Sequence, residues 1–225
     1  MCGRFTRHYT WQQIQWMYGL IPPASNLQPR FNICPTTDVD AVVSHDGRRE
    51  LVSMHWGLVP NWWNKPLKEM KLATFNARAE TVATKPIFRD AFRRSRCLLP
   101  ASGYYEWQNT PEGKQPYYFT RRDGEVMTIA GLWDEWADRA SGGKLKSCCM
   151  VITQANDLVA QVHDRMPVVL EPKDFQQWEQ GDPKDAAALM KPAANLVLQK
   201  WAVSTRVNSS RTSDEDASLI ERFAA

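Results

Sequence analysis

The sequence predicts an α+β fold in which a single domain, residues 1–225, has a curved antiparallel sheet or β-barrel-like core with peripheral helices. Many short apolar runs bounded by turn residues are typical of strands. A few segments with capping residues indicate short helices. With 225 residues, 43% hydrophobic and 24% charged, the chain has the composition of an ordinary globular protein that can bury a substantial core.

The first predicted helix spans residues 10–18. Thr10 and Gln13 have the spacing of a capping box, and Gly19 is typical of the position just after a helix. Pro86 suits the first position of a helix because its nitrogen needs no hydrogen-bond partner there. The other predicted helices span residues 86–94, 172–180 and 183–190.

The predicted strands are short and separated by turn residues. Asp46-Gly47 predicts a hairpin turn between residues 40–44 and 50–56. Asp123-Gly124 predicts a turn between the strands at residues 117–120 and 126–132. Further strands are predicted at 97–99, 104–107, 148–153 and 196–203. Side chains alternate along a strand, so Cys148 and Cys149 should point to opposite faces.

Composition and cysteine spacing exclude several classes of protein. The five cysteines form no CxxC pair, so we expect neither a zinc site nor a disulfide framework, and no metal or other cofactor. The sequence has no signal-peptide pattern and no run of 18 apolar residues, so we expect a cytoplasmic protein without membrane contact. We also expect the protein to be a monomer. A net charge of +3 is too small to indicate nucleic-acid binding by itself.

Cys2 is the most informative residue because it directly follows Met1. Removal of Met1 would leave an α-amine and a thiol two carbons apart, and both groups ordinarily titrate near neutral pH. Together they can attack one aldehyde carbon: the amine forms a Schiff base, and the thiolate closes a five-membered thiazolidine ring. An internal cysteine or a lysine cannot do this. The alternative interpretation is that Cys2 has no chemical role and stands at position 2 by chance.

Three polar residues stand where packing does not require them. Asn76 lies in the run FNARAET. The alternative interpretation is that this run is an ordinary exposed helix start or loop without a functional role. Glu106 lies between large aromatic residues in a predicted strand, and a buried carboxylate suits proton transfer. It could instead face solvent. His163 lies in a dense polar cluster, HDRMP, although a lone histidine is more often structural.

Basic residues accompany these candidates. Arg4 follows Cys2 closely, Arg78 is near Asn76, and Arg165 is near His163. Their positions indicate an anionic substrate, most naturally a phosphate group. Pro35 and the Trp62-Trp63 pair could form an apolar wedge against a base stack.

Eight runs, in order and covering nearly the whole chain, resemble the SRAP (SOS response-associated peptidase) family, the group that contains the YedK-like proteins. The runs are MCGRF (1–5), FNICPT (31–36), WGLVPNW (56–62), NARAET (76–81), CLLPASGYYEW (97–107), AGLW (130–133), HDRMP (163–167) and VN (207–208).

The resemblance implies the SRAP fold and a sensor of abasic sites in single-stranded DNA. It implies that Cys2 forms a thiazolidine crosslink after Met1 removal, which shields the site from strand cleavage, alongside self-processing peptidase and lyase-type chemistry. The implied catalytic residues are Cys2, Asn76, Glu106 and His163. The implied DNA contacts are Arg4, Arg78, Arg165, Pro35, Trp62 and Trp63. Such a protein would associate with the nucleoid when bound to DNA.

Two departures from the family pattern, Cys34 for alanine and Ser102 for aspartate, touch no implied role. Where some members have a basic DNA contact this chain has Pro86, and Lys85 is expected to take its place. Two other interpretations compete. One is an N-terminal-nucleophile cysteine amidohydrolase, which requires a layered αββα fold. The other is a non-catalytic DNA-binding module in which Cys2 is incidental.

Overall fold

The computed structural model describes residues 2–21, 26–138 and 142–223. Met1, on which the predicted processing bears, lies outside these residues. The strands are β1 (Phe5–Arg7), β2 (Arg30–Ile33), β3 (Asp38–His45), β4 (Arg48–Trp56), β5 (Asn76–Arg78), β6 (Arg96–Ala101), β7 (Gly103–Thr110), β8 (Gly113–Arg121), β9 (Met127–Ala137), β10 (Lys144–Gln154), β11 (Arg165–Pro167), β12 (Val169–Leu170) and β13 (Leu198–Ala202).

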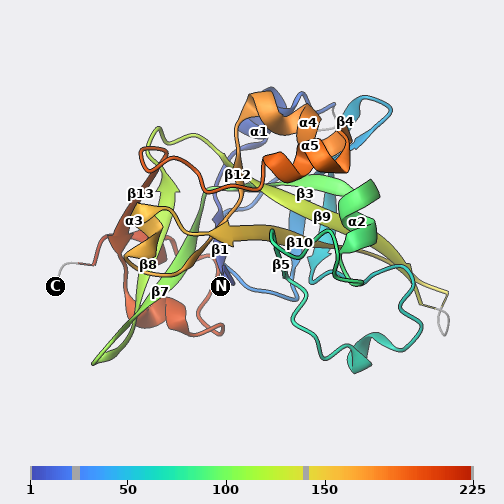
Figure 1. The fold of residues 1–225 in the computed structure, drawn as a ribbon. Helices are drawn as coiled ribbons and strands as arrows, with labels where there is room; N and C mark the ends of the chain where they lie inside the picture. The colour runs from blue at the N-terminus through green and yellow to red at the C-terminus, as the bar shows by residue number, and fades with distance from the viewer. Residues whose placement is uncertain (1, 22–25, 139–141, 224–225) are drawn as a thin grey trace.

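The helices are short and lie outside the sheets (Figure 1). The α-helices are α1 (Trp11–Tyr18), α2 (Arg89–Arg94), α3 (Asp157–Ala160), α4 (Phe175–Gln180) and α5 (Pro183–Ala188). The 3-10 helices are η1 (Leu67–Glu69), η2 (Pro172–Asp174), η3 (Thr205–Asn208) and η4 (Ala217–Ile220). Within the described residues, no helix is both long and apolar enough to cross a membrane.

Five strands close a barrel. β10 pairs with β4, β4 with β3, β3 with β6 and β6 with β9, and β9 returns to β10. The predicted α+β fold with a barrel-like core is therefore confirmed. Two strand pairs differ from the expected antiparallel pattern, because β4 and β5 both run parallel to β10.

A second sheet, in the order β13-β8-β7-β1-β2, packs against the barrel. The strand β1 lies in its interior, between β7 and β2, so the start of the chain is held at the centre of the molecule (Figure 1). This barrel with an added sheet is not the layered αββα arrangement that the amidohydrolase interpretation requires, and that interpretation is wrong about the fold.

Side chains alternate between two apolar clusters along the barrel strands. On β3, Val42 packs with the helices, including Ile14 of α1 and Trp178 of α4. Its neighbour Val43 belongs to the cluster that contains Cys2. Cys148 and Cys149 also divide between these two clusters, as predicted from strand alternation. The N-terminal residues are thus part of the main core.

Local signals for helix ends and turns were accurate. Thr10 caps α1 in a full capping box with Gln13, and Gly19 ends the helix with φ +65°. Asp46 and Gly47 both have positive φ, as a tight hairpin turn requires. The helix predicted from Pro86 instead begins at Arg89, because the preceding residues form a turn in which Phe88 N–H bonds the Lys85 carbonyl.

Several strands are longer than predicted, notably β9 and β10, because their polar ends still pair with each other across the sheet. Four short strands, β1, β2, β5 and β11, were not predicted at all. Each has three or four residues, too few to show alternation in the sequence.

Candidate active site

Cys2 lies just before β1 and is buried, with 1% of its surface exposed. Its thiol donates a hydrogen bond to the carboxylate of Glu106. Burial, followed by the negative charge of Glu106, raises the pKa of the Cys2 thiol well above its ordinary value. The sequence-based expectation that this thiol titrates near neutral pH is therefore wrong. The thiol is protonated at neutral pH and needs a base.

Glu106 lies on β7, which pairs with β1 so that Tyr104 stands opposite Phe5. This register brings Glu106 level with the residues before β1. Its side chain is buried, with 1% exposed, in an apolar cluster beside Tyr104. The predicted burial of this carboxylate is confirmed, and the solvent-facing alternative is wrong.

His163 follows the short helix α3 and faces Glu106, with 4.0 Å between His163 Nε2 and Glu106 Oε2. Its Nδ1 accepts a 3.0 Å hydrogen bond from the backbone N–H of Arg165. This bond places the proton of the neutral imidazole on Nε2, the nitrogen nearer to Glu106. Asp164 Oδ1 lies 3.0 Å from His163 Nδ1.

Asn76 is the first residue of β5, which extends the sheet along β10. It is therefore in a strand rather than in a helix start or loop. Its amide Nδ2 donates a 2.9 Å hydrogen bond to the Cys2 carbonyl oxygen. Its Oδ1 is buried and has no hydrogen-bond partner among the described residues. Asn76 thus holds the N-terminal backbone and keeps one acceptor for a ligand hydroxyl.

Tyr104 is a residue that sequence reasoning used only as an apolar neighbour of Glu106. Its ring stacks on Phe119 at 5.0 Å, and its hydroxyl is fully buried. That hydroxyl has no hydrogen-bond partner in the part of the chain that the structure describes. Burial, and then the nearby Cys2 and Glu106, raise the pKa of the Tyr104 hydroxyl, so it remains a neutral donor. Alternation along β7 could have indicated it, because residues 104 and 106 share one face.

The three candidate arginines differ in how strongly other groups hold them. Arg4 donates to Asn32 Oδ1 at 2.8 Å and to the backbone carbonyl of Val207. Arg165 forms an ion pair with Glu80 Oε1. The side chain of Arg78 is exposed to solvent. Protein acceptors thus hold the Arg4 guanidinium in place, Glu80 partly neutralises Arg165, and Arg78 is available to an anion.

The proposed wedge residues Trp62 and Trp63 lie apart from this cluster. Trp62 and Trp63 contact each other, and the Trp63 carbonyl accepts a hydrogen bond from Trp136. On β10, Leu145 pairs with Trp136 and Met150 pairs with Asn76. These two positions of β10 are five residues apart, which is roughly 16 Å along a strand. Pro35 is half-buried at the edge of a pocket, and Lys85 is exposed in the turn before α2.

The fold and these contacts define a site built around the amino-terminal cysteine of the chain. The family model described as SOS response associated peptidase (SRAP) matches residues 1–210, so the chain belongs to the SRAP family.

Named relatives align over most of the chain. Abasic site processing protein YoqW of Bacillus subtilis is 31% identical, covering 98% of this chain and 99% of the relative. Abasic site processing protein YedK of Escherichia coli is 30% identical over 79% of each chain. A solved protein from Bacteroides thetaiotaomicron has the same fold, with a TM-score of 0.89, 23% identity and 99% of this chain covered.

Proposed function

We propose that this protein captures abasic sites in single-stranded DNA as a covalent thiazolidine, through Cys2 and after Met1 is removed. The observation that carries the proposal is the contact set around Cys2. A buried carboxylate accepts the thiol hydrogen, an imidazole lies 4.0 Å beyond that carboxylate, and an amide holds the Cys2 carbonyl. Relatives named abasic site processing proteins support the choice of substrate.

The proposed reaction begins with opening of the closed abasic sugar. His163 donates its Nε2 proton to the ring oxygen as the bond from that oxygen to C1′ breaks. Glu106 takes the proton of the C1′ hydroxyl, so that C1′ becomes an aldehyde, and passes this proton to His163 Nε2, 4.0 Å away, which returns both side chains to their starting states. The α-amine of Cys2, after losing a proton to Glu106, bonds to C1′ and forms a carbinolamine. Glu106 returns the proton to the departing hydroxyl, so that water leaves and a Schiff base remains.

Ring closure then uses the same carboxylate a second time. Glu106 accepts the thiol proton as the Cys2 sulfur bonds to C1′ and gives the neutral thiazolidine. The raised pKa of the thiol makes this base necessary, because little thiolate exists at neutral pH before the step. Asn76 fixes the carbonyl of Cys2, whose Cα bears both the amine and the thiol-carrying side chain, so both nucleophiles are held near the same C1′ atom.

DNA binding is assigned to the arginines and the apolar loop residues. Arg78, with Arg4 and Arg165, would contact phosphates on either side of the missing base, without sequence preference. We further assign to Trp62, Trp63 and Pro35 the wedge against neighbouring bases, and to Lys85 an outer phosphate contact. Counterion release makes the affinity fall as salt rises, and single strands should bind more tightly than duplex.

The same terminus accounts for the peptidase and lyase chemistry. Met1 must be cleaved before the amine of Cys2 can react, and the protein's own site is proposed to perform this cleavage. The Schiff base could alternatively lose the 3′ phosphate by β-elimination, which would break the strand. Capture by the thiol competes with that loss and therefore protects the DNA.

Incubation with an oligonucleotide that carries one abasic site tests the proposal. Denaturing electrophoresis should show a covalent band, and intact mass should equal protein without Met1 plus DNA minus one water. Cys2→Ser should lose the stable band and keep at most a species trapped by borohydride. A full-strength stable band from Cys2→Ser, or from protein that still carries Met1, would rule out this mechanism.

A further inference from the structure

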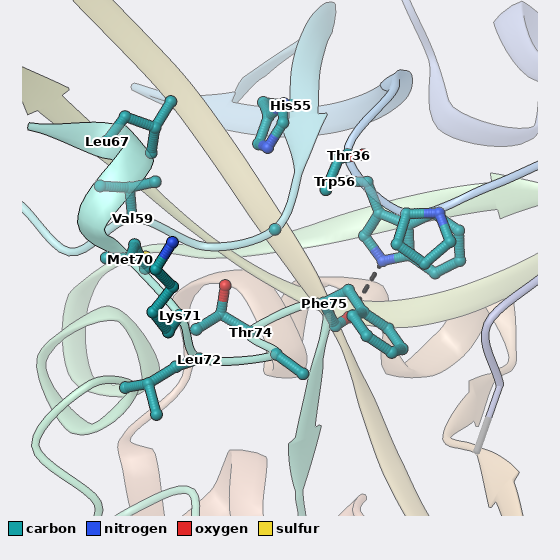
Figure 2. A pocket seen from close by; sticks show the side chains of 13 residues that line it. Thr36, His55, Trp56, Val59, Leu67, Met70, Lys71, Leu72, Thr74 and Phe75 are labelled. Atoms are coloured by element: carbon teal, nitrogen blue, oxygen red, sulfur yellow. Dashed lines mark hydrogen bonds between the residues drawn. The ribbon is translucent and has the colours of Figure 1, made fainter.

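A pocket of about 450 Å³ lies under the long loop that joins β4 to β5 (Figure 2). Its size falls within the range of about 300–1,000 Å³ that is usual for small-molecule sites. Most of its wall is apolar and is formed by Val59, Leu67, Met70, Leu72 and Phe75. The mechanism proposed above makes no use of this space.

Three polar groups converge in the pocket. A Cβ placed on Gly57 would stand 3.3 Å from His55 Nε2 and 3.8 Å from Thr74 Oγ1, so these two atoms flank one point on the pocket wall. Figure 2 shows the Lys71 ammonium and the Thr74 hydroxyl directed toward the same space. Burial lowers the pKa of His55, so its neutral ring offers one donor and one acceptor. This pattern fits the polar edge of a flat heterocycle held between apolar walls.

The pocket adjoins the Cys2 site at two places. Phe75 lines the pocket and directly precedes Asn76, whose amide holds the Cys2 carbonyl. Pro35 also lines the pocket and follows β2, the strand paired with β1. A strand of DNA with its abasic sugar at Cys2 would therefore bring a neighbouring nucleotide to the mouth of the pocket.

The loop over the pocket carries charge suited to a nucleotide. Lys65, Lys68 and Lys71 are exposed along it, with Glu69 as the acidic residue among them. Lys71 also lines the pocket, so one ammonium lies beside the apolar space and two lie outside it. A ligand with a flat apolar ring, a hydrogen-bonding edge and a phosphate matches this arrangement.

We propose that this pocket binds the base of a nucleotide next to the abasic site. The proposal rests on the function proposed above and deepens it, because it assigns a subsite for an intact base. Stacking of a base on an aromatic side chain strengthens binding to single-stranded DNA by about tenfold or more per base. Binding of this base would position the abasic sugar next to Cys2, whatever the sequence of the DNA.

The test uses single strands with a central tetrahydrofuran, which lacks both base and aldehyde and so binds without crosslinking. Four further strands each lack one more base, at one of the two positions on the 5′ side or one of the two positions on the 3′ side of the tetrahydrofuran. Fluorescence anisotropy should show that the wild-type affinity falls about tenfold for one of these four positions, as the energy of one bound base requires. Thr74→Val and Leu72→Glu should bind the parent strand more weakly and lose this positional dependence.

Lys68→Gln is the matched control, since Lys68 is an exposed lysine of the same loop that does not line the pocket. It should keep the full positional dependence. Equal affinity of the wild type for all the strands would overturn the subsite, and so would unchanged dependence in both pocket variants. A parallel assay with aldehyde-bearing DNA separates the two proposals, because an absent Cys2 crosslink there would overturn the catalytic proposal alone.

Discussion

The side-chain amide of Asn76 donates a 2.9 Å hydrogen bond to the carbonyl oxygen of Cys2, across 74 positions of sequence. This bond joins the edge strand β5 to the residues that precede β1 and limits rotation of the Cys2 backbone. Reaction of two groups of one residue with a single carbon depends on that restriction.

Asn76→Ala should slow crosslinking by about 100-fold, the size of effect expected when a reacting group loses its position by about 1 Å. Affinity for DNA that carries the tetrahydrofuran analogue should change little. Single-turnover crosslinking and anisotropy measure the two quantities. Asn109→Ala, at an exposed position of β7, is the control and should react at the wild-type rate.

Glu106→Gln should lower the pKa of the Cys2 thiol, because the charge that opposes thiolate formation is gone while burial remains. Crosslinking should nevertheless slow, since the proton acceptor is lost as well. Thiolate absorbance at 240 nm, measured against a Cys2→Ser reference, should rise at lower pH than in the wild type. A rise at higher pH would contradict the proposed interaction between Cys2 and Glu106.

Tyr104→Phe and Tyr105→Phe should have opposite effects on stability. The Tyr104 hydroxyl is buried without a partner among the described residues, so its removal should stabilise the fold by about 1 kcal/mol. The Tyr105 hydroxyl donates a 2.8 Å bond to the Phe31 carbonyl, so its removal should destabilise the fold by about 1 kcal/mol. Urea unfolding measures both changes.

The same pair should differ in activity. Tyr104→Phe should crosslink more slowly despite its greater stability, because the hydroxyl is a spare donor beside Cys2 and Glu106. Tyr105→Phe should react at the wild-type rate. Unaltered crosslinking in Tyr104→Phe would show that this hydroxyl takes no part in the reaction.

Glu80→Gln should strengthen binding to single-stranded DNA by releasing Arg165 from its ion pair. One more phosphate contact should also make the salt dependence steeper, by about 0.7 in the slope of log affinity against log salt. Glu135→Gln breaks an exposed pair with Lys144 on the β9–β10 hairpin and serves as the control. Equal affinities of Glu80→Gln and the wild type would place Arg165 outside the DNA contacts.

His163→Gln should slow formation and reversal of the crosslink by the same factor and leave the final crosslinked fraction unchanged. Both directions cross one barrier, at which His163 Nε2 carries the proton of the sugar oxygen. Time courses from free and from crosslinked DNA measure the two rates. A change in one direction alone would exclude this shared proton transfer.

The sequence predicted elements whose signals are local. The capping box at Thr10 and the hairpin turn at Asp46-Gly47 depend on neighbouring residues only, and the structure has both. Alternation along β10 likewise predicted the divergence of Cys148 and Cys149. Closure of the barrel by a parallel pair could not be predicted, because β4 and β10 meet only after some ninety residues of chain.

In the candidate site, too, features with a local sequence signal were predicted, and features that depend on distant segments were not. Residue type and context singled out Cys2, Glu106, His163 and Asn76, and the structure brings these four together. The raised thiol pKa was not predictable, since it arises from burial in a core that forms between distant strands. The separation of Trp62 and Trp63 from Cys2 was equally hidden, because that loop is anchored by Asn61 to Asp134 on β9.

The strand β10 pairs with β4, β5, β9 and β11, and so supports the barrel wall together with the strands that begin at Asn76 and Arg165. The backbone amide hydrogens of β5 and β11 should therefore exchange with solvent only when the barrel itself unfolds. A chain that loses the barrel also loses the geometry at Cys2, so partly unfolded molecules would lack the reactive arrangement altogether.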